Sequence, residues 1–274
     1  MRVWPALGDE LFYLRERLRH SKEFATFQKK FWLDHYAPGD PVVLSGPFSG
    51  MRYLKNNFLG PALPRWLGTY EAELHGVICD RILQKKYDLI LVVGSAEGFY
   101  ACGFARHFPA TPILSFETTL ISRIQQKCLL KINNVRNVQI NGKLNIKEFL
   151  RLIRNKKCLC LIDIEGAEID FCSLTSIPFL GRADLLLEIH ASGNRSPKQV
   201  LEKIKSELDR THCTKILNPI RRNIAALKAH IASQWTIKEL EQATKEHRGV
   251  NQQWLWAEAK IIRLKKQNHS KTYR

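Results

Sequence analysis

The sequence predicts an α/β fold in which a mostly parallel β-sheet is covered by helices on both faces. From residue 67 onward, short apolar segments of strand length alternate with amphipathic segments of helical length. This alternation is typical of a parallel sheet. A chain of 274 residues is long enough for one large α/β domain, or one domain and a helical extension. Its composition, 45% hydrophobic and 25% charged, is that of a globular protein.

The N-terminal part differs in texture from the rest. Residues 1–36 have leucines and phenylalanines at helical spacings, which predicts amphipathic helix. Residues 37–66 are rich in proline and glycine, which predicts an irregular connector with at most a short strand pair. The expected elements that follow are helix 70–86, strand 87–93, helix 99–108, strand 113–116, helix 118–132, strand 137–140, helix 146–155, strands 158–162 and 184–190, helix 197–210, strand 214–217, helix 237–247 and strand 252–259.

Composition and charge limit the possible functions. No apolar run approaches the roughly 20 residues that span a bilayer, and the N-terminus lacks the apolar core of a signal peptide. The seven cysteines show no metal-type spacing, so we expect a reduced, cytoplasmic protein without a transmembrane segment. The formal charge is +17, and residues 193–274 hold 18 Lys and Arg against 7 Asp and Glu. This basic third could face an anionic partner, although a solvated surface explains it equally well.

A glycine turn follows the first strand and is the expected cofactor site. Ligands of open α/β sheets bind beyond the carboxyl ends of the strands, and here strand 87–93 runs into Gly94-Ser95-Ala96-Glu97-Gly98. Glycines let a backbone approach a ligand closely, and the next helix offers unpaired N–H groups. The spacing is neither the G-x-G-x-x-G of dinucleotide sites nor that of a phosphate loop.

An acid at the end of the second strand strengthens this interpretation. Glu117 lies about twenty residues after the glycine turn, where a carboxylate can accept both hydroxyls of a ribose. It could equally cap the helix that follows. Glycine turn and acid together indicate an adenosine-containing ligand, and the absence of a pyrophosphate loop favours S-adenosylmethionine (SAM).

Four motifs resemble those of one enzyme family. They are "LVVGSAEGFYA", "SFET", "LIDIEGAEID" and "LLLEIH", of which D-x-E-G-x-E followed by a strand ending E-I-H is the most specific. Together they resemble the FkbM-type, SAM-dependent class I methyltransferases, over roughly residues 45–258 and in an uncharacterised branch. The resemblance implies a Rossmann-like, seven-stranded sheet with an antiparallel last strand, and O-methylation of sugars or other hydroxylated small molecules. The change of sequence texture at residue 67 and the polar C-terminus divide the chain into an N-terminal helical extension and connector (1–66), a methyltransferase domain (67–260) and a basic flexible tail (261–274).

The acids after strand 158–162 are the candidate catalytic groups. A carboxylate near a cationic methyl sulfonium is electrostatically favourable, and transfer to a hydroxyl also requires removal of a proton. The expected catalytic residues are Asp163, His190 and Glu165. We expect Asp163 and His190 to face one another, and Glu168 and Asp170 to point to solvent or cap a helix, because four converging unpaired carboxylates would repel. The residues expected to bind the cofactor are Gly94, Ser95, Ala96, Glu97, Gly98, Glu117, Asn141 and Glu71.

Three alternatives remain open from the sequence. The carboxylates and His190 could hold a divalent metal, although we expect no resident metal. The basic third could serve an RNA methyltransferase, although no RNA-binding module is recognisable. The family usually has an acid two residues before the first glycine, where this chain has Val92. Glu97 or Glu71 could offset this loss, or the chain could be a non-catalytic SAM-fold binding protein.

Overall fold

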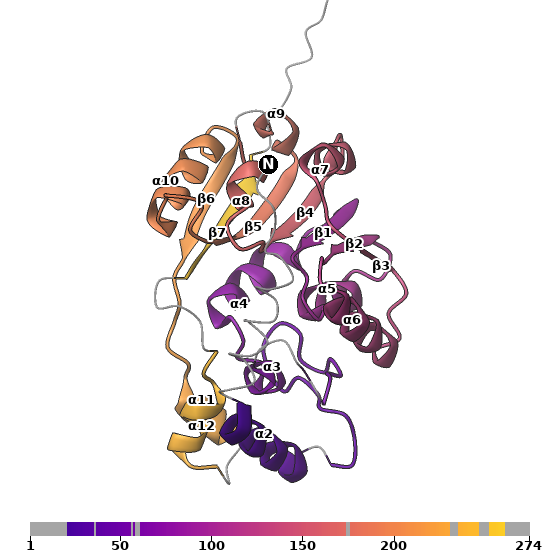
Figure 1. Cartoon of the computed structure of the whole chain (residues 1–274), viewed down its shortest axis with the longest axis vertical. Helices are drawn as coiled ribbons and strands as arrows, with labels where there is room; N and C mark the ends of the chain where they lie inside the picture. The colour runs from indigo at the N-terminus through magenta and orange to yellow at the C-terminus, as the bar shows by residue number, and fades with distance from the viewer. Residues whose placement is uncertain are drawn as a thin grey trace, which may run out of the picture.

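The computed structural model describes residues 21–35, 37–55, 57, 61–173, 176–230, 235–246 and 252–260. These residues contain a seven-stranded sheet of order β3-β2-β1-β4-β5-β7-β6 (Figure 1). Strand β7 is antiparallel to both of its neighbours, and the other six strands run parallel to one another. The strands are β1 (Leu89–Val93), β2 (Ile113–Phe116), β3 (Val138–Asn141), β4 (Cys158–Ile162), β5 (Ala183–Ile189), β6 (His212–Leu217) and β7 (Gln253–Ala259).

The sheet confirms the predicted fold class. Every predicted strand is present, and its ends lie within two residues of their expected positions. The antiparallel last strand is also where the family resemblance implies it. Strand positions were predictable because β1, β4 and β5 are buried along their whole length and therefore read as continuous apolar runs.

Helices cover both faces of the sheet, and each face has its own apolar cluster. Since successive side chains of a strand point to opposite faces, Ile90 and Val92 belong to one cluster and Leu89, Leu91 and Val93 to the other. The first cluster includes side chains of α5 (Phe99–His107) and α6 (Leu120–Ile132). The second includes side chains of α7 (Ile146–Ile153), α8 (Glu168–Phe171), α9 (Ile177–Leu180) and α10 (Pro197–Leu208).

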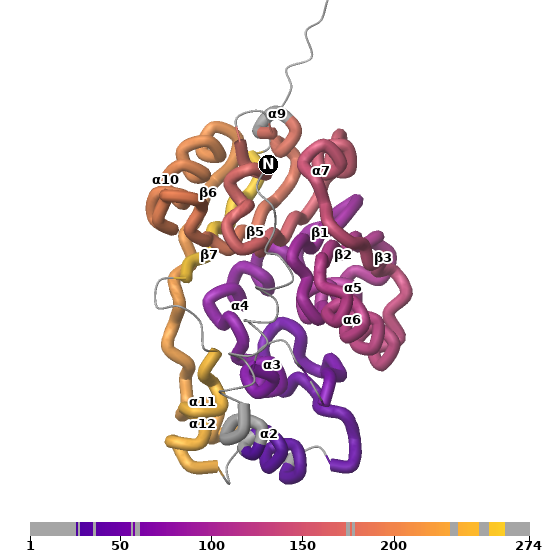
Figure 2. The backbone as a smooth tube through the Cα atoms, viewed as in Figure 1, coloured from indigo at the N-terminus to yellow at the C-terminus, as the bar shows by residue number. Residues whose placement is uncertain are grey.

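A small helical lobe lies beyond the carboxyl edge of the sheet. It combines α2 (Ser21–His35) and α3 (Ala62–Leu67) with α11 (Ile224–His230) and α12 (Ile237–Ala243), which the chain reaches from the carboxyl end of β6 (Figures 1 and 2). The Phe31 ring lies 4.7 Å from the Trp235 ring, centroid to centroid. Segments from both ends of the chain therefore close over the edge at which ligands of such sheets bind.

Several local predictions need correction. The prediction of one regular α-helix over residues 70–86 is wrong. The segment consists of η1 (Ala72–Leu74, a 3₁₀ turn), α4 (His75–Val77) and η2 (Ile78–Ile82, a π-helical turn). Its amphipathic pattern is real, because Ile78 and Ile82 are both buried in the core. The described part of the connector has the expected minimal strand pairing, a bridge between Val42 and Arg52. The short helices α3, α8, α9 and α11 were not predicted, because four to seven residues do not establish a period.

Some predictions lie outside the described residues. These are the first part of helix 1–36, up to residue 20, and the tail 261–274. Among the residues that are described, no helix has both the length and the apolar character needed to cross a membrane.

Candidate functional site

The glycine loop after β1 is held against the ends of the neighbouring strands. Gly94 and Ser95 donate their backbone N–H groups to the carbonyl oxygen of Phe116. Gly94 has a φ of 82°, and a Cβ added there would lie 1.6 Å from the carbonyl oxygen of Asp163. Only glycine fits at this position, because the loop passes directly over the end of β4.

Glu117 lies beside this loop as expected. One of its carboxylate oxygens accepts the N–H of Ala96 at 2.9 Å, and the other accepts the N–H of Thr119 at 2.8 Å. The second contact is with the residue just before α6 and does not cap the helix, because no described side chain accepts an N–H group of the first turn of α6. A carboxylate offers about four lone-pair sites, so Glu117 keeps acceptor capacity for a ligand.

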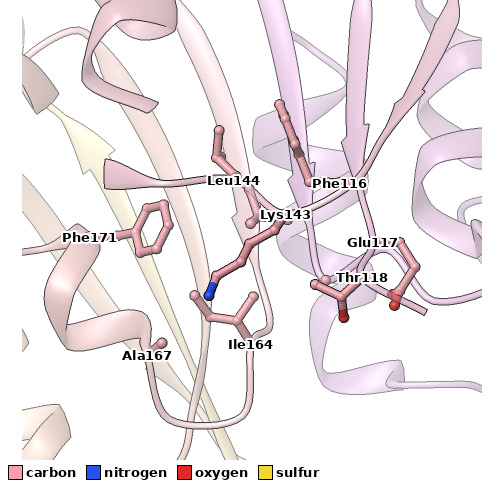
Figure 3. A pocket seen from close by; sticks show the side chains of 11 residues that line it. Phe116, Glu117, Thr118, Lys143, Leu144, Ile164, Ala167 and Phe171 are labelled. Carbon is pink, nitrogen blue, oxygen red and sulfur yellow. The ribbon is translucent and has the colours of Figure 1, made fainter. Parts of the chain in front are cut away.

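A pocket opens between the glycine loop and the loops after β3 and β4 (Figure 3). It encloses about 310 Å³ of empty space, part of it open to solvent. Its walls are mostly apolar side chains with Glu117 at one side, and Figure 3 shows the Lys143 side chain extending across it. The lining residues are Val93, Gly94, Phe116, Glu117, Thr118, Gly142, Lys143, Leu144, Ile164, Ala167 and Phe171.

Asp163 and His190 face each other at the ends of β4 and β5, which confirms that prediction. His190 Nε2 lies 3.8 Å from Asp163 Oδ1 and 3.9 Å from Glu188 Oε2. The Asp163 side chain is 31% exposed and shares a hydrogen bond with the buried Glu188 carboxyl group. Partial burial, followed by the charge and hydrogen bond of Glu188, raises the pKa of Asp163 well above its usual range.

Glu165 approaches the same imidazole from the solvent side. Its Oε2 atom lies 3.6 Å from His190 Nε2, and its side chain is 85% exposed. Asp163, Glu165 and His190 each have one potential metal-ligand atom, and these atoms lie within 4.8 Å of one another, a spacing that also suits a divalent cation. The structure thus brings together the three side chains expected to be catalytic.

Glu168 is the clearest correction to the sequence-based account. It was expected to point to solvent or to cap a helix, but its side chain is fully buried and caps none. Its oxygens accept the backbone N–H groups of Ile164 and Gly166, and Oε1 lies 2.8 Å from His190 Nδ1. Asp170 is exposed, as predicted. Glu168 can be buried because it is paired with backbone donors and an imidazole. The acids nevertheless converge on His190, and their repulsion is felt at Asp163.

The environment of His190 shifts its protonation. Burial by itself lowers the pKa of His190. The hydrogen bond with Glu168 and the charges of Glu168, Glu188 and Glu165 outweigh burial, so its pKa is raised above the ordinary value for histidine.

The other predicted cofactor residues occupy distinct places. The Glu97 carboxylate turns away from the pocket toward Arg65 and Tyr53, so a ligand would meet only its backbone. Glu71 is buried, accepts a hydrogen bond from the hydroxyl of Tyr100, and is close enough to add to the pKa shift of Asp163.

Asn141 and Val92 complete the set. Asn141 ends β3, and its side-chain amide binds Ser115 and Gln139 rather than pointing freely toward the pocket. Val92 is fully buried in the apolar cluster that includes α5.

Sequence reasoning missed two further residues at the site. Glu188 precedes His190 by two positions, and alternate residues of a strand face the same side. That spacing in "EIH" was the available signal for Glu188. Gln252, just before β7, places its side-chain nitrogen 3.3 Å from His190 Nε2. No sequence signal marked it, because its position depends on the antiparallel pairing of β7 with β5.

Comparisons with known proteins give low similarity. No family model and no curated protein matches the sequence. One similar solved structure is the O-methyltransferase TomG from Streptomyces achromogenes, involved in tomaymycin synthesis and in complex with SAM, at 11% identity and TM-score 0.46, covering 71% of this chain and 82% of that one. Another is precorrin-6y C5,15-methyltransferase from Geobacter metallireducens, at 12% identity and TM-score 0.42, covering 63% of this chain and 80% of that one. A third is an rRNA methylase from Streptococcus thermophilus, at 9% identity and TM-score 0.43, covering 70% and 99%. Similarity at this level carries no argument about activity, which must come from the site itself.

Proposed function

We propose that this chain is a SAM-dependent, FkbM-type methyltransferase that methylates a hydroxyl group of a small molecule or glycan. One observation carries the proposal. Gly94 of the glycine loop lines an apolar pocket bearing the Glu117 carboxylate, and the same glycine lies against the backbone of Asp163, which belongs to a cluster with Glu188 and His190. In this proposal residues 67–260 form the catalytic domain, and the described helices α2 and α3 lie over its carboxyl edge. A cytoplasmic location accords with the seven cysteines, all described and all unpaired.

The adenosine part of SAM is assigned to this pocket. Phe116, Leu144, Ile164 and Phe171 provide apolar walls for a flat base. Glu117 has acceptor sites left for ribose hydroxyls after its two backbone contacts. The backbone of Gly94, Ser95, Ala96, Glu97 and Gly98 would then pass beside the ligand.

Glu71 is proposed to replace the acid that the family has at the position of Val92. The methionine end of SAM carries a cationic ammonium group, which a buried carboxylate would stabilise. Glu71 lies close enough to Asp163 to influence its pKa. A carboxylate at position 92 would instead be placed inside an apolar cluster.

The residues beyond the loop are suited to position a hydroxyl and take its proton. When bound, SAM supplies an electrophilic methyl group on a cationic sulfur. The hydrogen-bonded pair of Asp163 and Glu188, which shares a proton, provides one negative charge beside that position, which favours the sulfonium. His190 Nε2 faces the same opening and would accept the proton of the acceptor hydroxyl. Glu165, at the solvent side, would contact the acceptor.

RNA is the alternative acceptor, and the basic charge of residues 193–274 favours it. Binding of RNA would weaken steeply with salt, because each neutralised phosphate releases counterions. If a labelled oligoribonucleotide binds with a steep salt dependence and is methylated, the glycan or small-molecule assignment is wrong. If SAM does not bind, the chain is a non-catalytic protein of this fold.

Calorimetric titration with SAM tests the proposal. The wild type should bind SAM, and Glu117→Ala should lose a charge-assisted hydrogen bond worth about 1.5–3 kcal/mol, or roughly 10- to 150-fold in affinity. Glu202→Ala, which removes an exposed carboxylate on α10, is the matched control and should bind normally. Equal affinity in wild type and a folded Glu117→Ala protein would disprove the cofactor assignment.

A further inference from the structure

Glu168 and His190 form a buried pair that the proposed reaction does not yet use. Glu168 starts the short helix α8, and its side chain has no exposed surface. His190 follows β5 and is 11% exposed. Glu168 Oε1 lies 2.8 Å from His190 Nδ1. The contact joins the loop after β4 to the end of β5, the two elements that carry the candidate catalytic groups.

The hydrogen bonds of Glu168 determine which partner donates to which. Glu168 Oε1 accepts the N–H of Ile164 at 3.0 Å, and Oε2 accepts the N–H of Gly166 at 3.0 Å. A backbone N–H can only donate, and a carboxylate can only accept. The remaining contact of Oε1, with His190 Nδ1, is therefore an N–H donated by the imidazole.

The other ring nitrogen of His190, Nε2, is left as a hydrogen-bond acceptor. A neutral imidazole with a proton on Nδ1 has a lone pair on Nε2. Around Nε2 lie Asp163 at 3.8 Å, Glu165 at 3.6 Å and Glu188 at 3.9 Å, all beyond hydrogen-bond distance. The side-chain nitrogen of Gln252, at 3.3 Å, can donate to Nε2, which agrees with an unprotonated Nε2.

We propose that Glu168 is a positioning residue that holds His190 in the Nδ1–H tautomer and so keeps Nε2 available as the proton acceptor. The last step rests on the proposed function: the O–H bond of the acceptor breaks, the proton joins Nε2, and the electron pair stays on the acceptor oxygen. In the other tautomer Nε2 carries a proton and cannot accept one. Glu168 acts only through His190 and touches neither cofactor nor acceptor.

The tautomer can be measured on the full chain without any substrate. Imidazole nitrogens labelled with ¹⁵N give different correlation patterns for the two tautomers, and the His190 signals are assigned by their loss in His190→Gln. The spectrum is recorded at alkaline pH, where the imidazole is neutral. We expect the Nδ1–H form in the wild type, with a solvent-protected Nδ1 proton that shows cross peaks to the Glu168 side chain. A dominant Nε2–H form, or a Nδ1 proton in rapid exchange with water, would overturn the proposal.

Two variants test whether Glu168 causes this preference. Glu168→Ala should lose the dominance of the Nδ1–H form, whereas Asp170→Asn, an exposed acid on the same helix, should keep it. A folded Glu168→Ala protein with an unchanged tautomer would refute the positioning role. If Glu168→Ala does not fold, the wild-type spectrum still shows whether His190 is in the Nδ1–H tautomer that the proposal requires. SAM titration of the wild type tests the proposed function, which is wrong if SAM does not bind. The tautomer of His190 tests the role of Glu168 and does not depend on that titration.

Discussion

The buried ion pair between Glu97 and Arg65 gives the sharpest test of how the N-terminal segment supports the glycine loop. Arg65 Nε lies 2.8 Å from Glu97 Oε1, and the two side chains are 6% and 1% exposed. The hydroxyl of Tyr53 donates to the same oxygen at 2.5 Å. The Arg65 guanidinium also lies 3.8 Å from the centre of the Tyr70 ring. Glu97 thus anchors the loop to α3 and the connector.

We expect Glu97→Gln to destabilise the protein strongly. The change keeps the shape of the side chain but leaves Arg65 buried without a neutralising charge, which costs about 3–5 kcal/mol. At two to four degrees per kcal/mol, the midpoint of thermal unfolding should fall by roughly 6 to 20 °C. Urea unfolding followed by circular dichroism gives the free energy directly.

Two further variants isolate the cause. Replacing both partners, in Arg65→Met with Glu97→Leu, should recover most of the loss, because no unpaired charge remains. Asp209→Asn breaks the exposed Lys205–Asp209 pair and should cost less than about 1 kcal/mol. If Glu97→Gln unfolds like the wild type, or if it loses SAM affinity without losing stability, the carboxylate is not a structural anchor.

Three other outcomes are expected. Asp163→Asn should stabilise the protein near neutral pH but not below about pH 4. The pKa of Asp163 is raised in the folded state, so the stability of the wild type falls as the pH rises from the pKa of the unfolded state through that of the folded state. If urea unfolding gives the same difference between variant and wild type at both pH values, this prediction is contradicted. Gly94→Ala should destabilise the fold, since the new Cβ meets the Asp163 backbone, whereas Gly142→Ala, with nothing within 4 Å of its Cβ, should not; equal unfolding free energies for the two would contradict the loop geometry. If His190 takes the proton of the acceptor hydroxyl without a metal, calorimetry should show no tight binding of Mn²⁺ to the wild type. Tight binding that Glu165→Gln weakens would instead favour the metal alternative.

The sequence predicted the sheet better than the helical lobe. Strands such as β1 and β4 are buried on both faces, so their apolar runs are visible without tertiary information. The lobe depends on contacts such as Phe31 with Trp235, which join segments about two hundred positions apart. No local pattern carries that information.

The positions of site residues were predictable where the sheet topology alone determines them, and not where side-chain packing determines them. Asp163 and His190 follow neighbouring parallel strands, so they had to meet at one edge. Glu168 was misplaced for the opposite reason. Whether an acid near a helix start faces water or folds inward depends on its available donors, here Ile164, Gly166 and His190 for Glu168.

A crystal structure of the protein with S-adenosylhomocysteine would test the central claim most directly. We expect the base in the pocket lined by Phe116 and Leu144, the ribose hydroxyls on Glu117, and the sulfur on the side of the glycine loop that faces Asp163 and His190. A ligand bound elsewhere, or one in the pocket whose sulfur lies away from Asp163 and His190, would contradict the proposed methyltransferase site.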